Sequence, residues 1–333
     1  MKLTVTHLLD DATPGGVTRV IDGLRTSKAL QNQGDHELQM VSSGGNWPTF
    51  EADVIVSHLA LSWRNLPSLM SLRAKHPNAV LIHVEHSYTQ RFTALNVPNR
   101  ERFYSLLRSA YALFDQVVAV SRAQGAWMAT RALVDQTKLR TIRSSVDLDQ
   151  FARLPAPIHG PRVLGLIGRL HTQKGFDQAI AAFKHLENPD LRLKIFGTGA
   201  DLEALKAHAG SDTRISFKGF CNDPTDAVAQ IDALVMPSRW EAFGLVAQEA
   251  LIAGRHVLVA PVDGLKDQIE DGAMPMTGVG ISALTSDLKR LIDMPAPDAA
   301  TDRAGLATEN QRRFETQWLQ MFDELAAPQK AVA

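Results

Sequence analysis

The sequence has one cysteine, no long apolar run and almost no net charge, and each of these shortages excludes a class of protein. Cys221 has no second cysteine with which to form an intrachain disulfide, which suits a reducing compartment. No stretch approaches the roughly 20 apolar residues of a membrane-spanning helix, and residues 1–9 alternate like a strand rather than a signal peptide. The formal net charge of −1 creates no field that would attract nucleic acid. We therefore expect a cytoplasmic protein that binds no nucleic acid and touches a membrane, if at all, only peripherally at its inner face.

The chain is long enough for two domains, each with its own hydrophobic core. It has 333 residues, of which 45% are hydrophobic and 21% are charged, as in ordinary globular proteins. Short apolar runs alternate with helical stretches, which predicts parallel sheets built from βα units and therefore the α/β class. The predicted strands are residues 3–9, 37–41, 53–56, 79–84, 116–120, 138–142, 162–167, 191–196, 215–220, 232–236, 256–260 and 279–281.

Residues 153–162 contain three prolines and one glycine, which interrupt both the helical and the strand periodicity. This composition predicts a linker between a first domain, 1–152, and a second domain, 163–305. The closing segment, 306–333, continues a helical pattern that begins at residue 302, and we expect its apolar side chains to pack as core.

Residues 236–260 hold a turn, an apolar helix and a buried strand in immediate succession, and the rest of the chain is organised around them. Gly244 opens the helix and Gly254 follows its end, because glycine readily adopts the positive φ common at helix ends. Between these glycines only Gln248 and Glu249 are polar, and Glu249 falls on an apolar face. Its carboxylate is either partly solvated near the helix middle or faces a cleft, where it accepts hydrogen bonds from the hydroxyl groups of a ligand.

Three segments carry features that bind phosphate groups. The backbone amides of residues 242–245 lie at a helix start, which is a ready anion site. The pair Gly15 and Gly16 lies between a strand and a helix and allows close backbone approach, although such a pair more often only makes a turn. The loop 168–175 carries two cations but lacks the spacing of a Walker loop, so that two solvated side chains are the ordinary alternative.

Two motifs in these segments resemble one known family. Glu241 and Glu249 are separated by seven residues within Pro-Ser-Arg-Trp-Glu-Ala-Phe-Gly-Leu-Val-Ala-Gln-Glu-Ala, which closely resembles the signature of the retaining glycosyltransferases of family 4, or group 1, with the GT-B fold. Gly-Arg-Leu at 168–170, followed by Lys174-Gly175, matches a second motif of that family. The resemblance implies two Rossmann-like doubly wound domains that face an interdomain cleft, with the last helix crossing back to the first domain. Ala242 stands where the family usually has glycine, so the turn must avoid positive φ there.

The resemblance also implies a role for each candidate site residue. Arg169 and Lys174 would hold the donor diphosphate, with Glu241 beside the donor sugar and phosphates and Glu249 at the ribose. His86 would lie near the transferred sugar and the acceptor. We assign catalytic roles to Arg169, Lys174, Glu241 and His86. The donor would also meet the backbone at the glycine-rich turns and the helix start, at Gly15, Gly16, Gly197, Thr198, Gly199, Phe243, Gly244 and Leu245.

Histidines stand just beyond two predicted strands of the first domain. In parallel sheets function gathers beyond the carboxyl ends of the strands, where His58 and His86 lie. A hydrogen-bonded loop histidine is the ordinary interpretation, and we prefer it for His58. His83 and His86 do not predict a metal site, because strand residues three apart point to opposite faces.

Two further patterns favour ordinary interpretations. Residues 91–114 carry Arg91, Arg100, Arg102 and Arg108 among aromatic side chains, which indicates an amphipathic helix with a solvated basic face. The alternative is a patch that meets a lipid diphosphate or anionic head groups. Residues 147–149 spell Asp-Leu-Asp, a metal-binding motif of other glycosyltransferases, but their place just before the linker indicates coincidence.

The resemblance implies a retaining glycosyltransferase of the hexosyltransferase type, and we expect it to need neither a metal ion nor a cofactor. Its donor would be a UDP- or GDP-sugar and its acceptor a glycan, a lipid-linked or a small molecule, in cell-envelope or exopolysaccharide synthesis. The competing hypotheses are another GT-B enzyme, a sugar-nucleotide epimerase or phosphorylase, and a non-catalytic nucleotide-sugar-binding protein.

Overall fold

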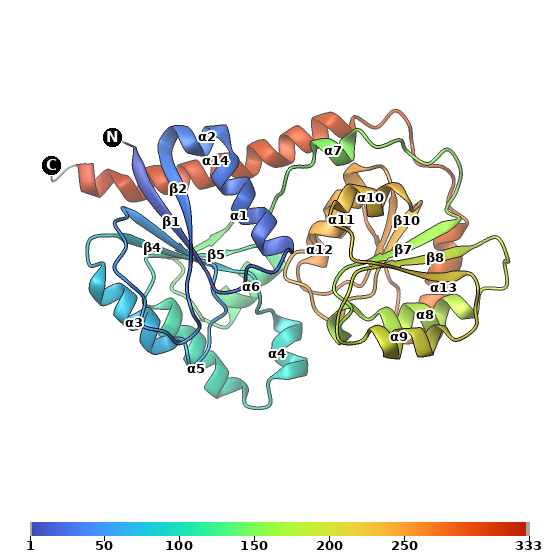
Figure 1. Cartoon of the computed structure of the whole chain (residues 1–333), viewed down its shortest axis with the longest axis horizontal. Coiled ribbons are helices and arrows are strands. Elements are labelled where there is room, and N and C mark those ends of the chain that lie inside the picture. The colour runs from blue at the N-terminus through green and yellow to red at the C-terminus, as the bar shows by residue number, and fades with distance from the viewer. Residues whose placement is uncertain (1, 331–333) are drawn as a thin grey trace. The chain divides into compact units, whose positions relative to one another are not determined.

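The computed structural model describes residues 2–330, and the side chains of residues 2–325. Contacts between residues divide the chain into two compact units, Met1–Val146 with Asn310–Ala333, and Asp147–Glu309. Each unit contains one six-stranded sheet with helices on both faces (Figure 1). All strand pairs in both sheets are parallel. The predicted α/β class with two doubly wound, Rossmann-like sheets is therefore confirmed.

The first unit has the strand order β2-β1-β3-β4-β5-β6. Its strands are β1 (Leu3–Leu9), β2 (Gly34–Met40), β3 (Val54–Ser57), β4 (Val80–Glu85), β5 (Gln116–Ala119) and β6 (Leu139–Thr141). Its helices are α1 (Gly16–Thr26), α2 (Lys28–Gln33), α3 (Leu66–Lys75), α4 (Gln90–Asn96), α5 (Arg100–Tyr111) and α6 (Arg122–Thr130), together with the later part of α14 (Arg303–Lys330).

The second unit has the strand order β12-β11-β10-β7-β8-β9. Its strands are β7 (Val163–Ile167), β8 (Arg192–Phe196), β9 (Ile215–Gly219), β10 (Ala233–Met236), β11 (His256–Val259) and β12 (Met274–Pro275). Its helices are α7 (Asp149–Ala152), the short 3-10 helix η1 (Thr172–Lys174), α8 (Phe176–Lys184), α9 (Leu202–Ala209), α10 (Pro224–Ala229), α11 (Leu245–Ile252), α12 (Leu265–Glu270) and α13 (Ile281–Ile292).

The central strands are apolar along their whole length because helices cover both faces of each sheet. All four residues of β10 are buried, and alternate ones enter two different clusters. Ala233 and Val235 pack with α8, α9 and α13, whereas Leu234 and Met236 pack with α10, α11 and α12. In Figure 1 these two sets of helices lie on opposite sides of the sheet.

Two predicted elements are wrong. Residues 279–281 are not a strand: Gly280 has φ +88 at the start of α13 and Val279 is 94% exposed, so the last strand of the sheet is β12 instead. Residues 91–114 form two helices, α4 and α5, rather than one. Pro98 lies between them, and the Asn99 side chain starts α5 anew by accepting a hydrogen bond from the amide of Arg102.

The division between the units lies at 146/147, whereas the composition of the linker places the boundary of the first domain at 152. The difference is α7, which packs on α10 and α11 of the second unit and buries Phe151. At the other end, α14 begins in the second unit and is counted with the first unit from Asn310 on. In the first unit the Ser27 hydroxyl donates to Glu315 at 2.6 Å, and Phe322 packs against the ring of His36.

Each sheet has a point at which the strand order reverses. In the second unit the chain runs from β7 through β8 to β9 and then returns to β10 on the other side of β7. In the first unit β2 and β3 lie on either side of β1. Ligands of such sheets bind beyond the carboxyl ends of the strands at this reversal. The loops after β7 and β10, and those after β1 and β3, are therefore the places to look for a site. No helix among residues 2–330 combines the length and hydropathy needed to cross a membrane.

Candidate functional site

An ion pair joins the two loops at the reversal point of the second sheet. Lys174 ends η1 after β7, and Glu241 lies in the loop after β10. The Lys174 ammonium donates to the Glu241 carboxylate at 2.5 Å, and the two side chains are only 16% and 13% exposed. The sequence assigned both residues to one site but did not predict that they bind each other. An ammonium has three N–H donors, so Lys174 can hold this carboxylate and still donate to an anion.

The glycine next to this pair is required by the fold. Gly175 has φ +67, and a Cβ there would lie 2.2 Å from the carbonyl oxygen of Pro237. The loop after β7 thus packs directly on the backbone of the loop after β10. This close approach explains the Lys-Gly dipeptide without any reference to a ligand.

A second ion pair, which sequence reasoning missed, holds the same two loops together. The Arg239 guanidinium donates to both carboxylate oxygens of Asp177, at 3.0 and 2.7 Å, and to the carbonyl of Thr172. Burial alone would raise the pKa of Asp177, but the hydrogen bond and charge of Arg239 hold it below its ordinary value. Arg239 lies two residues before Glu241, and Asp177 lies in the first turn of α8. In the sequence, neither residue can be distinguished from a solvated charged side chain, so the pair could not be predicted.

Arg169, unlike Lys174 and Arg239, does not hold the two loops together. It is exposed, and among the described residues it makes no hydrogen bond or ion pair. It lies in the loop after β7 together with Lys174. Lys174 is paired with the Glu241 carboxylate, whereas Arg169 is unpaired among the described residues. The loop therefore retains positive charge that can bind an anionic ligand.

The start of α11 has the conformation that its glycine predicts. Gly244 has φ +90, and a Cβ there would lie 2.5 Å from the Leu265 side chain. Ala242 avoids positive φ, as the turn requires. The amides of Phe243, Gly244 and Leu245 thus belong to the turn that opens the helix. Phe243 and Gly244 are buried and Leu245 is half-buried.

A strained residue beside this turn was not predicted. Asp263 has φ +41, which is uncommon for a residue other than glycine, and one of its carboxylate oxygens lies 3.4 Å from the amide of Glu241. The amide of Gly264 donates to the Glu241 carbonyl at 2.9 Å. The loop after β11 therefore positions the backbone of Glu241, and the Asp-Gly dipeptide is the signal that indicates this turn.

Glu249 is fully buried in α11. The partly solvated alternative is therefore wrong. A ribose would reach this carboxylate only if the side chain turned or its covering residues moved. Glu249 is the fifth residue of α11 and lies eight residues after Glu241, which belongs to the loop before the helix.

The turn after β8, at Gly197, Thr198 and Gly199, is hydrogen-bonded to the backbone of the loop after β7. The amides of Gly168 and Leu170 donate to the carbonyls of Phe196 and Thr198, at 3.0 and 2.8 Å. A Cβ at Gly197 would lie 1.9 Å from the carbonyl oxygen of Gly168. Packing between the loops after β7 and β8 thus requires glycine here. Thr198 and Gly199 are exposed on the outside of this turn.

The other glycine pair is different. Gly15 has an extended backbone with φ −176, which any residue adopts, and a Cβ at this position would lie 3.7 Å from its nearest neighbour, the Thr13 carbonyl oxygen. The amide of Gly15 donates to the hydroxyl of Thr18, which closes the first turn of α1. Gly15 and Gly16 are both exposed at the carboxyl end of β1. The fold does not require glycine at position 15, so the open surface is available for a ligand.

His86 lies at the carboxyl end of β4 in the first unit and is half-buried. Its Nε2 is hydrogen-bonded to Nδ1 of His58 at 2.9 Å, so His58 is a hydrogen-bonded histidine as predicted. Burial lowers the pKa of His86 to about 4, and the ring is neutral at neutral pH. His83 points to the other face, as the alternation of strand side chains predicts; there it packs against Phe114, and its Nδ1 lies 3.3 Å from the Ser57 hydroxyl.

The turn that carries His86 is held by a buried carboxylate. Glu85 accepts hydrogen bonds from the amides of Ser87 and Tyr88, at 2.8 and 2.9 Å, and from the hydroxyl of Tyr111 at 2.8 Å. Burial would raise the pKa of Glu85, but the hydrogen bond and charge of His83, together with the amides of Tyr88 and Ser87, lower it below the ordinary value. A charged Glu85 therefore fixes the backbone of the two residues that follow His86, Ser87 and Tyr88.

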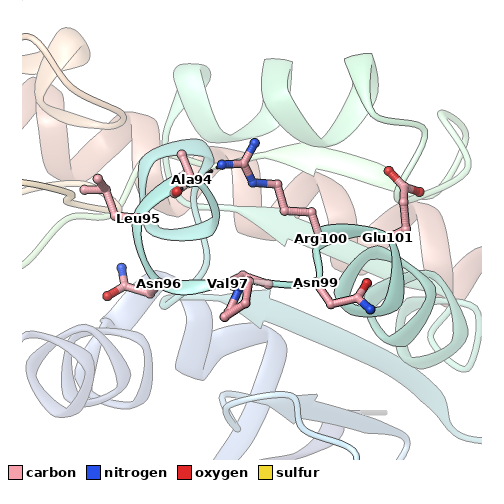
Figure 2. A pocket seen from close by; sticks show the side chains of 8 residues that line it. Ala94, Leu95, Asn96, Val97, Asn99, Arg100 and Glu101 are labelled. Carbon is pink, nitrogen blue, oxygen red and sulfur yellow. Dashed lines mark hydrogen bonds between the residues drawn. The ribbon is translucent and has the colours of Figure 1, made fainter.

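Three arginines of the basic segment, Arg100, Arg102 and Arg108, make contacts within the first unit. Arg100 donates to the carbonyl of Ala94 at 3.1 Å, across a pocket lined by the α4–α5 connection, Ala94–Glu101 (Figure 2). Arg102 stacks on Trp63, and Arg108 donates to the carbonyls of Arg131 and Ala132. None of the predicted site residues lines this pocket.

The Asp-Leu-Asp segment does not gather ligands for a metal ion. Asp147 is exposed, and it accepts a hydrogen bond from the amide of Asp149 at 3.0 Å, an ordinary turn. In the described part of the chain, no three His, Cys, Asp or Glu side chains are grouped so that they could hold a metal ion.

Two family models match the chain, one after the other. "Glycosyltransferase Family 4" matches residues 45–150, and "Glycosyl transferases group 1" matches residues 151–294. The second match contains every candidate residue of the second unit, from Arg169 to Glu249.

Characterised relatives match about half of the chain. The 2-deoxystreptamine glucosyltransferase of Streptomyces kanamyceticus is 33% identical over 190 residues, which are 51% of this chain and 49% of that protein. The lipopolysaccharide core biosynthesis mannosyltransferase LpsB of Rhizobium meliloti is 30% identical over 194 residues, 55% of this chain and 54% of its own length. The chain thus spans about half the length of the curated relatives it matches.

Solved structures match nearly the whole chain. HepE (Alr3699) of Anabaena, in complex with UDP and glucose, has a TM-score of 0.72 at 18% identity and covers 96% of this chain and 99% of its own. Sucrose-phosphate synthase of Thermosynechococcus elongatus has a TM-score of 0.75 at 18% identity, with 98% and 100% covered. At this identity the likeness shows that the fold is shared.

The Lys174–Glu241 pair predicts different effects for the two cations of the loop. Lys174→Ala leaves the shielded Glu241 carboxylate without its ammonium, and we expect a loss of about 2 kcal/mol in the free energy of unfolding. Arg169→Ala, the matched control, should change it by less than about 0.5 kcal/mol. Urea unfolding of the purified variants measures both. Equal stability of the two variants would contradict the structural role of the pair.

The two glycine pairs predict opposite responses to alanine. Gly197→Ala places a Cβ against the Gly168 carbonyl at positive φ, and should cost at least about 2 kcal/mol in the free energy of unfolding. Gly15→Ala should change it by less than about 0.5 kcal/mol, because the backbone is extended and the space is open. Thermal unfolding of the two variants checks this, and a stable Gly197→Ala protein would show that the two loops are not packed as described.

The Arg239–Asp177 pair predicts a pH dependence. The pKa of Asp177 is lower in the folded state than its ordinary value of 3.8, so the pair stabilises the fold above that value and loses this contribution as the pH falls through the folded pKa. Both side chains are partly exposed, so Arg239→Ala should cost about 1 kcal/mol near pH 7. The difference in Tm from the unmodified chain should shrink as the pH falls below 3.8 and through the lower pKa of the folded state. A difference that stays constant with pH would show that only the bond to the Thr172 carbonyl matters.

Proposed function

Since this chain belongs to the glycosyl transferases group 1, the family 4 type with the GT-B fold, we propose that it transfers a sugar from a nucleotide-diphosphate donor with retention of the anomeric configuration. The observation that carries the proposal is the pair of loops at the reversal point of the second sheet. These loops combine the exposed Arg169, the Lys174–Glu241 pair and the amides that open α11.

This arrangement suits departure of a nucleoside diphosphate. As the bond from the anomeric carbon to the phosphate breaks, negative charge develops on the leaving oxygens. Arg169 can donate to these oxygens without losing any bond that the fold uses. Lys174 can donate to them from a position that Glu241 already fixes, so little reorganisation is required. Because side chains and amides supply the positive charge, we expect transfer without a metal ion and without a cofactor.

The relatives and solved structures support the donor and the pathway. The HepE structure contains UDP and glucose, which favours a UDP-sugar, and the mannosyltransferase of lipopolysaccharide core biosynthesis favours a cell-envelope or exopolysaccharide product. The 2-deoxystreptamine glucosyltransferase keeps a small-molecule acceptor open. We propose a UDP- or GDP-sugar as donor and a glycan, lipid-linked or small-molecule acceptor, reached in the lipid-linked case by peripheral contact with the membrane.

In the first unit, we propose that Gly15 and Gly16 bind donor phosphate and that His86 binds the sugar or the acceptor. The open surface at Gly15 admits phosphate oxygens close to the backbone. His86 is neutral, so it meets the sugar or the acceptor as a hydrogen-bonding group rather than as a cation. In the second unit, Glu249 binds the ribose once its side chain is uncovered.

The proposed donor site predicts the outcome of a ligand screen. UDP-, GDP- and ADP-sugars are added to the purified protein, and the sugars of one nucleotide base should raise the Tm.

Arg169→Ala should keep the Tm of the free protein but lower the transfer rate about 100-fold or more, because it removes a cation from the leaving group. Transfer should be unaffected by EDTA. Glu249→Gln should weaken nucleotide affinity in calorimetry and leave the catalytic rate of saturated enzyme less affected.

Ordinary transfer by Arg169→Ala would refute its assigned role. Turnover that depends on orthophosphate would indicate a phosphorylase, and an epimerised free nucleotide sugar would indicate an epimerase. Binding of a donor without its consumption, in the presence of a lipid extract and glycan acceptors, would favour a non-catalytic nucleotide-sugar-binding protein.

A further inference from the structure

Four histidines form a continuous hydrogen-bonded row across the sheet of the first unit. Nε2 of His86 is bonded to Nδ1 of His58 at 2.9 Å, Nε2 of His58 to Nδ1 of His7 at 3.0 Å, and Nε2 of His7 to Nδ1 of His36 at 3.0 Å. Neighbouring rings are stacked, with centroids 5.2 to 5.3 Å apart and planes inclined by 23° to 26°. Every link therefore has the same geometry and the same order of ring nitrogens.

The row follows from the register of the parallel strands. His36, His7, His58 and His86 come from four neighbouring strands or their ends, in the sheet order β2, β1, β3 and β4. Each step moves the next histidine two residues toward the carboxyl end: His36 is level with Val5, His7 with Val56, and Ser57 with His83. Because strand side chains alternate between faces with a period of two, this staircase keeps all four rings on one face.

The row is neutral at neutral pH. Burial, with smaller contributions from His36 and Arg25, lowers the pKa of His7 to about 3. Burial and the neighbouring histidines lower the pKa of His58 well below its ordinary value. Burial also lowers the pKa of His36 to about 4, although the Leu30 carbonyl and Asp35 act in the opposite direction. His86 has a pKa of about 4. The row therefore stores no positive charge.

Neutral rings in such a row cannot choose their tautomers independently. Each ring carries one proton, and each of the three links holds one proton between two nitrogens, because two N–H groups or two lone pairs that face each other repel. Four protons fill three links and leave one proton for an end of the row. Either all four rings are protonated on Nδ1, and His86 presents an N–H at Nδ1, or all four are protonated on Nε2, and His86 presents a bare Nδ1.

The far end of the row is closed off from solvent. Nε2 of His36 is buried and has no hydrogen-bond partner among the described residues. A proton at that nitrogen and a proton at Nδ1 of His86 exclude each other. The state of His86 is thus linked to groups around His36, on the edge strand β2.

We propose that His36, His7 and His58 are positioning residues that form a tautomer relay, and that this relay decides whether Nδ1 of His86 acts as a hydrogen-bond donor or as an acceptor toward the substrate. The consequence for transfer rests on the proposed function; the relay itself does not. A sugar hydroxyl that donates to Nδ1, or an oxygen that accepts from it, selects one of the two proton orders for the whole row.

The first test reads the tautomers directly. The protein is labelled with 15N at histidine, and two-bond correlations at neutral pH identify the protonated nitrogen of each ring. His76 is an internal reference in the same unit, because its Nδ1 lies 2.8 Å from the Leu72 carbonyl and its Nε2 accepts from the Phe50 amide, which fixes it as the Nδ1–H form. We expect the four relay histidines to share one tautomer, and to keep a shared tautomer after UDP is added. Mixed tautomers in either state would overturn the relay.

The second test measures transfer. His7→Leu breaks the row without touching His86, and should lower kcat about 10-fold with little change in the KM of the donor. The matched control is His76→Leu, which removes another buried, doubly bonded histidine of the same unit and should reduce stability without reducing kcat. If His7→Leu does not fold, His36→Leu on the edge strand takes its place. Equal kcat losses in the relay and control variants, per folded molecule, would overturn the relay.

The two tests separate this inference from the proposed function. A shared tautomer in a protein that transfers no sugar would leave the relay standing and refute the function. Mixed tautomers in an active transferase would do the reverse.

Discussion

The contact between Lys174 and Glu241 is the interaction on which the site of the second unit depends. It lies where the strand order of the sheet reverses, and it joins the loops that diverge there. An unpaired carboxylate or ammonium at this degree of shielding would be costly, so the pair stabilises both loops. The same pair holds an ammonium in place before any ligand arrives. Structural and chemical demands on Lys174 are therefore met by one geometry, whereas Arg169 meets the chemical demand alone.

The glycines of the site divide in the same way. Gly175, Gly197 and Gly244 each have positive φ and each would bring a Cβ within 2.5 Å of a neighbouring atom. Close packing of the loops after β7, β8, β10 and β11 accounts for them. Gly15 has neither constraint. A glycine that the fold does not require is better evidence for a ligand than one that packing already explains, because only the former remains unexplained when the protein is empty.

Much of the fold could be predicted because it is written in local patterns. Eleven of the twelve predicted strands overlap strands of the structure, since parallel strands covered on both faces are continuous apolar runs. The predicted strand at 279–281 is wrong because Gly280 starts a helix. The single helix predicted at 91–114 is wrong because Pro98 interrupts it and Asn99 starts a second helix. Motifs located Arg169, Lys174, Glu241 and Glu249, but they gave no partners. The Arg239–Asp177 pair joins residues 62 positions apart, and only the fold brings them together.

The histidine row could not be predicted from the sequence, because it depends on how the strands pair. His7, His36 and His58 have no common spacing, and each alone is an ordinary histidine in or beside a strand. Their relation depends on the register of three parallel strand pairs, which is set by packing across the whole sheet. A shift of one residue in any pair would turn its histidine to the opposite face. The row is therefore a property of the assembled sheet, and a substitution that slips β2 would disconnect His36 from the row without altering any residue near His86.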